Sequence, residues 1–200
     1  MVRTIAKDHG EKRDAILKTA AKFFAENGFD RASMSQLAAE CGISKALIYH
    51  YYASKEVLLY DIIHTHLKDL VEAVEAVEPV DDPKTHLRNL VHAILTQYRD
   101  ADAEHKLQLD ATKVLPESDQ QKLADMQRQL VVTFSTVIKS VSPDYFENRQ
   151  ETLRPVTMSL FGMLNWFYMW YRRGKGMTRP EYADLATDLL LGGIKGLEER

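Results

Sequence analysis

The sequence has 200 residues, of which 45% are hydrophobic and 28% charged, a composition that suits one or two compact domains with a sizeable core. Its net charge of -3 excludes a chain that coats nucleic acid along its whole length, yet residues 1–60 hold nine Lys or Arg against seven Asp or Glu, so this end suits phosphate. The single Cys excludes an internal disulfide framework, and the longest nearly unbroken apolar run, residues 160–171, is shorter than the ~20 residues that span a bilayer. We therefore expect a soluble, cytoplasmic protein with no membrane partner.

Residues 1–10 are polar and are expected to be mobile. They form either a frayed end or an arm in which Arg3 and Lys7 reach a neighbouring DNA groove or phosphate. From Glu11 onward, apolar residues recur at helical spacing until Asn27 and Gly28, which together are a helix stop signal. The sequence therefore predicts a first helix over residues 11–27.

Residues 33–52 predict two short helices joined by a tight turn. Ser33 followed by Gln36 is a capping box, so a helix begins at about Met34. Gly42 supplies the turn, and Ser44 is placed to cap a second helix that buries an apolar side. A Gly-containing turn of about three or four residues between two short helices is the helix-turn-helix connection, so the second helix is expected to enter a DNA groove.

The exposed side of that second helix carries the side chains expected to read bases. Lys45 can donate to guanine, while Ala46 and Leu47 can touch a thymine methyl group. Ser35, near the start of the preceding helix, is expected to reach a base or a phosphate. Ser44 and Ser33 are first of all helix caps, with any phosphate contact secondary.

The remainder of the chain predicts an all-α protein. Ser54 opens a long helix that runs to about residue 77, and the segment 78–83, with two prolines and two acids, marks the break after it. Further helices are expected over residues 87–98, 103–112, 118–141, 148–173 and 178–197, where Pro155 either kinks its helix or marks its start. The predicted domains are 1–53, which binds DNA, and 54–200, in which 54–77 is a connecting helix.

Residues 158–171 are apolar on nearly every side, which predicts a helix that is covered all round. A partner subunit on one side and an internal cavity on the other would provide that cover. Met, Phe and Trp side chains suit a pocket for an apolar ligand, although core packing explains them equally well. The side chains expected to line this pocket are Met126, Phe134, Met163, Trp166, Phe167 and Trp170.

The motifs of common enzyme classes are missing from the sequence. It has no nucleophile elbow, no phosphate-binding loop, no zinc-protease motif and no paired cysteines. We therefore expect no catalytic residues, no metal and no cofactor. Cys41 is expected to be a small core side chain rather than a sensor thiol.

Residues 28–59, GFDRASMSQLAAECGISKALIYHYYASKEVLL, resemble the DNA-binding segment of the TetR family of transcriptional regulators. The resemblance implies a homodimer, formed through the last two helices, that binds a palindromic double-stranded DNA operator as a repressor. It also implies that Tyr49, His50 and Lys55 hold the DNA backbone. Leu47 departs from the family pattern, in which a small hydroxyl residue is common at this position.

The tail over residues 160–193 resembles family members that sense acyl-CoA thioesters. This resemblance implies an apolar or amphipathic small-molecule effector, with an acyl-CoA thioester as one candidate, that releases the protein from DNA. Two alternatives stay open from the sequence. One is a DNA-binding regulator that has no effector or that activates transcription, and the other is a helical small-molecule-binding enzyme or carrier.

Overall fold

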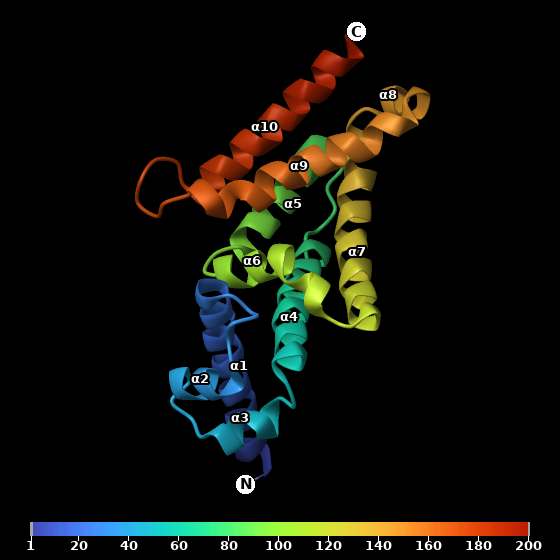
Figure 1. Ribbon diagram of the computed structural model, residues 1–200. Helices are drawn as coiled ribbons and strands as arrows, with labels where there is room; N and C mark the ends of the chain where they lie inside the picture. Colours follow the sequence, from blue (N-terminus) through green and yellow to red (C-terminus); the bar gives the residue numbers. More distant parts are fainter. Residues whose placement is uncertain (1, 200) are drawn as a thin grey trace. The chain divides into compact units, whose positions relative to one another are not determined.

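The computed structural model describes residues 2–199, with side chains from residue 9 onward, and is built almost entirely of helices (Figure 1). Arg3 and Lys7, predicted to reach DNA, lie outside the described side chains. Over residues 2–199 no strand forms, and Arg172 and Lys175 make an isolated antiparallel bridge. The all-α prediction is confirmed. The helices are α1 (Val2–Asn27), α2 (Met34–Glu40), α3 (Lys45–Tyr51), α4 (Lys55–Glu75), α5 (Pro83–Gln97), α6 (Asp102–Asp110), a 3-10 turn η1 (Thr112–Val114), α7 (Glu117–Val141), α8 (Pro143–Asn148), α9 (Gln150–Trp170) and α10 (Arg179–Glu198).

The chain forms two compact units. Unit 1 consists of residues 1–67 and 101–124, so it includes α6, which packs against α1, and the start of α7. Unit 2 consists of residues 68–100 and 125–200. The helix α4 continues from one unit into the other, because the division falls between Leu67 and Lys68.

Side-chain caps define several helix starts. Asp82 accepts a hydrogen bond from the backbone N–H of Thr85, and Pro83 occupies the first turn of α5. Thr178 and Glu181 form a complete capping box at the start of α10. These caps satisfy backbone donors that would otherwise lack partners at the helix ends.

Three features of the helices differ from the sequence prediction. The first helix begins at Val2 rather than Glu11, because Gly10 in a helix interior costs only ~1 kcal/mol and does not stop it. A short helix, α8, follows the predicted break, with Pro143 preset for its first turn and Phe146 fully buried beneath it. Pro155 lies inside α9, which begins at Gln150, so it does not mark the start of that helix.

The core of unit 1 contains a pair of buried histidines. His66 of α4 is 5% exposed and His105 of α6 is 1% exposed, and their ring centroids lie 5.8 Å apart. Burial, followed by repulsion from His105, lowers the pKa of His66 to about 3. This imidazole is therefore neutral at physiological pH.

In unit 2, ion pairs tie α5 to α10. The guanidinium of Arg88 contacts Asp184 at 2.9 Å and Asp188 at 2.5 Å, and His92 Nε2 lies 2.9 Å from Asp184. Hydrogen bonding to His92 and then to Arg88 holds the pKa of Asp184 below its ordinary value.

Over the part of the chain that is described, no helix is both long and apolar enough to cross a bilayer.

Candidate DNA-binding site

The two short helices of unit 1 are built from local hydrogen bonds. Ser33 Oγ accepts from the backbone N–H of Gln36 at 3.2 Å, and the Gln36 side chain accepts from the Ser33 backbone N–H at 3.0 Å. Gly42 adopts φ +64 in the turn, a conformation that side chains disfavour. Ser44 Oγ then accepts from the backbone N–H of Leu47 at 3.1 Å and starts α3. The predicted capping box, turn and second cap are confirmed.

The helix α3 has one buried side and one exposed side. Ile48 is fully buried and Tyr52, which follows the helix as its C-cap, is 4% exposed. The side chains of Lys45, Ala46, Tyr49 and His50 are exposed, together with Ser33, Ser35 and Ser44. Lys45 Nζ lies 6.0 Å from the centroid of the Tyr49 ring. The structure therefore presents a cation and polar rings together on one accessible surface.

Leu47 occupies a different environment from the other predicted readers. It is half-buried and lines a cavity of about 200 Å³ against α1 and the turn, whose other lining residues are Lys12, Ala15, Ile16, Thr19, Cys41, Ile43 and Tyr51. Its side chain therefore lies partly between α3 and α1 rather than wholly on the exposed side of α3. Burial raises the pKa of the Cys41 thiol in the same cavity, which keeps it protonated.

The structure contains a hydrogen-bonded network beside the buried side of α3 that the sequence did not predict. The Tyr52 hydroxyl donates to Asp61 Oδ2 at 2.7 Å, and Arg13 donates to both carboxylate oxygens of Asp61, at 2.6 and 2.7 Å. His9 adds a ring contact to Tyr51, with centroids 4.6 Å apart. No sequence spacing links Arg13 to Asp61, because they lie 48 residues apart.

Lys55, predicted to hold a phosphate, has a structural role in addition. Its ammonium lies within hydrogen-bonding distance of the carbonyl oxygens of Phe29, Asp30 and Ala32, at 3.1, 3.3 and 3.4 Å. These contacts fasten the loop before α2 to the first turn of α4. The phosphate contact itself stays a prediction.

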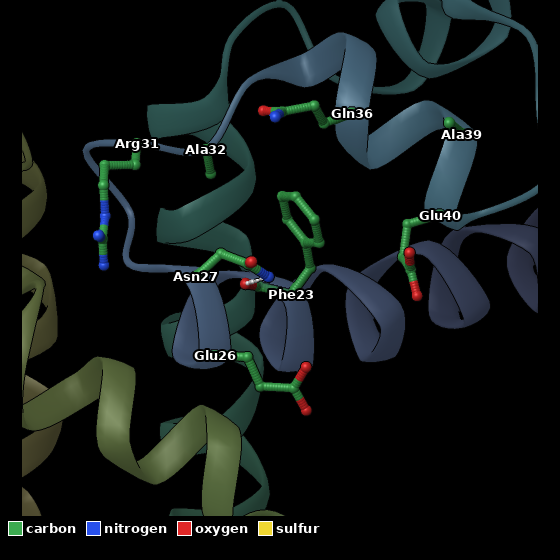
Figure 2. Close-up of a pocket in the computed structure, with 8 residues that line it drawn as sticks. All are labelled: Phe23, Glu26, Asn27, Arg31, Ala32, Gln36, Ala39 and Glu40. Atoms are coloured by element: carbon green, nitrogen blue, oxygen red, sulfur yellow. Dashed lines mark hydrogen bonds between the residues drawn. The ribbon is translucent and has the colours of Figure 1, made fainter.

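A groove between α1 and α2 lies apart from the predicted DNA contacts. It has a volume of about 610 Å³ and is lined by Phe23, Glu26, Asn27, Arg31, Ala32, Gln36, Ala39 and Glu40. Figure 2 shows the ring of Phe23 pointing from α1 towards α2. The groove mixes both signs of charge and contains none of the nine predicted DNA-binding residues, so we assign it no ligand.

The six predicted ligand-lining residues lie in unit 2 but do not form a single cluster. Phe134 is fully buried and packs against Phe161, with ring centroids 5.1 Å apart. Phe167 is buried beside Trp170 in a separate aromatic cluster, with centroids 5.0 Å apart. Met126 and Met163 are half-buried, whereas Trp166 and Trp170 are 59% and 49% exposed. A pocket lined by these residues stays a prediction.

The helices α9 and α10 lie side by side (Figure 1). Each of them exposes large apolar side chains. We define the apolar surface by the exposed side chains of Met158, Trp166 and Met169 of α9 and of Leu185 and Leu189 of α10. They recur at spacings of three, four or eight residues, as one side of a helix requires. Gly162 lies between two of them on α9, and Gly192, Gly193 and Gly196 follow Leu189 on α10. All four glycines are exposed, and a Cβ added at any of them would meet no neighbouring atom within 4 Å.

Comparison with known proteins agrees with this architecture. Residues 16–62 match the model of the bacterial regulatory proteins of the tetR family, and residues 80–194 match a tetracyclin repressor-like C-terminal domain. The chain therefore belongs to the TetR family. Family members and the relatives it matches are named as transcriptional regulators, and no enzyme is among the names.

Individual relatives are similar over different lengths. The regulator BetI of Agrobacterium fabrum is 35% identical over 82 residues, which are 40% of this chain and 40% of BetI. The matched stretch covers less than half the length of each of the first curated relatives. A TetR-family regulator from Bordetella parapertussis 12822 is 32% identical with a TM-score of 0.84, over 90% of this chain and 93% of that chain.

AibR, whose crystal structure contains isovaleryl coenzyme A and operator DNA, is similar in fold. It has a TM-score of 0.73 at 22% identity, over 90% of this chain and 98% of that chain. At this identity the similarity shows a shared fold alone.

Proposed function

We propose that the chain is a homodimeric transcriptional regulator that reads a palindromic DNA operator with the exposed side of α3. The observation that carries this proposal is the exposed set of Lys45, Tyr49 and His50 on a helix whose opposite side is buried. A lysine on an accessible helix can donate to guanine in the major groove, and tyrosine and histidine can contact phosphates. Family membership supports the same role.

The remaining predicted contacts divide by chemistry. Ala46 supplies a methyl group suited to a thymine, and the exposed part of Leu47 does the same. Ser35 and the caps Ser33 and Ser44 are exposed, so their hydroxyl groups are available to a base or a phosphate. Lys55 is the proposed contact that is least available, because carbonyl oxygens already surround its ammonium.

The apolar surface of α9 and α10 is the proposed dimer interface. A second copy would cover the exposed Met158, Trp166 and Leu189, and the exposed glycines of the two helices would let the two backbones approach closely. A two-fold interface uses the same surface on both subunits, which suits a two-helix face. The exposure of Trp166 therefore favours a place in the interface over a place in a ligand pocket.

Selection from a random pool of DNA duplexes tests the proposed function. The protein should enrich a two-fold symmetric sequence whose half-site centres lie about 34–36 Å apart, or a multiple of that distance. The protein-bound duplexes should be washed at physiological salt, so that duplexes held by phosphate contacts alone are removed. Absence of any enriched sequence would contradict the proposal.

We further propose repression that is relieved by an apolar or amphipathic small molecule, with an acyl-CoA thioester as the first class to test. Support comes from the family and from the fold shared with AibR, whose structure contains isovaleryl coenzyme A. Isovaleryl coenzyme A should raise the melting temperature and weaken operator binding, whereas free coenzyme A should do neither. A regulator that has no effector, or that recognises another class of small molecule, would show no change in melting temperature with any acyl-CoA of a chain-length series.

A further inference from the structure

The carboxylate of Asp61 joins three helical segments of unit 1. It lies on α4, accepts two hydrogen bonds from Arg13 on α1, and accepts a third from Tyr52, the residue that ends α3. The Asp61 side chain is 17% exposed and that of Arg13 is 41% exposed, so solvent screens this pair only partly. Burial, and then the hydrogen bond to Asp61, raises the pKa of Tyr52, which keeps its hydroxyl a donor.

The helix α3 is otherwise held by one buried side chain and by partly buried contacts, in which Leu47 lies against α1 and Tyr51 contacts His9. It is seven residues long, and Ile48 is its only fully enclosed side chain among the described residues. One fully buried residue fixes the depth of a helix, and partly buried contacts fix its rotation and tilt only weakly, so a hydrogen-bonded anchor at one end constrains its orientation further. The Tyr52 hydroxyl bond provides that anchor at the C-terminal end of α3.

We propose that Asp61, through the Tyr52 hydroxyl, is a positioning residue that sets the orientation of α3 for sequence reading. This inference rests on the proposed function and adds to it a residue that touches no DNA. Base contacts require side chains held to a fraction of an ångström, whereas phosphate contacts tolerate small displacements because exposed cations are mobile. Loss of the anchor therefore weakens binding to the operator more than binding to unrelated duplex DNA.

Tyr52→Phe removes the hydroxyl and leaves the ring, which makes it the sharpest test. The matched control is Tyr98→Phe in unit 2, because Tyr98 is similarly buried and its hydroxyl also donates a 2.7 Å bond, to Asn165. Both variants should lose stability to a similar extent. Only Tyr52→Phe should weaken operator affinity, by roughly tenfold, while affinity for a scrambled duplex stays within about twofold.

Asp61→Asn and the double variant complete a thermodynamic cycle. If the residues act as one anchor, the double variant should bind the operator about as weakly as the worse single variant. Fluorescence anisotropy with the enriched and scrambled duplexes, well below the melting temperature of every variant, measures these affinities. Unchanged operator affinity in Tyr52→Phe, or equal loss on both duplexes, would overturn the positioning role.

The proposed function fails in a different way. If the unmodified chain binds no duplex preferentially, the proposed function itself is overturned. If the unmodified chain prefers an operator and Tyr52→Phe retains that preference in full, only the positioning role is overturned.

Discussion

The ammonium of Lys55 lies over the ring of Phe29, 4.5 Å from its centroid, and also lies 3.1 Å from the carbonyl oxygen of the same residue. One side chain thus holds both the ring and the backbone of the loop that leads to α2. Because that loop carries the capping serine, Ser33, its position determines where α2 begins.

Lys55→Met should therefore lower the free energy of unfolding by about 1–2 kcal/mol, through loss of the cation–π contact and of the carbonyl contacts. Urea unfolding followed by circular dichroism measures this loss. The predicted phosphate contact has a separate readout, since its loss should reduce the slope of log affinity against log salt by about one. A normal slope combined with lower stability would leave Lys55 with a structural role alone.

Leu189→Glu should convert the protein to a monomer, because each copy would then bury an unpaired carboxylate in the interface. The dimer dissociation constant should rise by at least ~100-fold, since each unpaired buried charge costs several kcal/mol. The matched control is Val132→Glu on α7, because Val132 is 56% exposed and Leu189 is 58% exposed. Light scattering coupled to gel filtration should show a monomer for the first variant and a dimer for the second, and the same mass for both would refute the assigned face.

Acidification should destabilise the protein through His66. Its pKa is about 3 in the folded chain against an ordinary value of 6.5, so the unfolded chain binds more protons between these values. The free energy of unfolding should therefore fall as pH drops below about 6.5, by up to ~1.4 kcal/mol per pH unit from this residue.

Urea titrations at pH 7.5, 6.0 and 5.0 measure the effect of acid on the wild-type chain and on His66→Phe. The two proteins are compared by how much the free energy of unfolding changes with pH, because the substitution also alters packing, and hence stability, at every pH. His66→Phe should lose less stability on acidification than wild type. Parallel curves for the two proteins would show that His66 does not carry the pH dependence.

The sequence was sufficient to predict features that depend on neighbours in the chain. The capping box at Ser33 needs residues only three positions apart, and the buried side of α3 follows from helical spacing. The apolar segment of α9 was recognised for the same reason. Local patterns of this kind leave a direct record in the order of residues.

Features that depend on packing between distant segments could not be predicted from the order of residues. Arg13 and Asp61 meet only because α1 and α4 are brought together, and nothing in either local sequence distinguishes them from surface charges. The half-buried place of Leu47 depends on a cavity formed with α1. Trp166 and Phe167 are neighbours in the sequence, yet the first is 59% exposed and the second 1%, because only the second faces the aromatic cluster of unit 2.

Base reading by the exposed side of α3 is tested most directly by measuring the affinity of Lys45→Ala for the selected operator and for operators with single base-pair changes. The control is Lys84→Ala, an exposed lysine on α5. We predict that Lys45→Ala loses ~1–3 kcal/mol of preference at one base pair in each half-site and leaves the other positions unchanged. Equal weakening at every position, or behaviour indistinguishable from Lys84→Ala, would contradict base reading by α3.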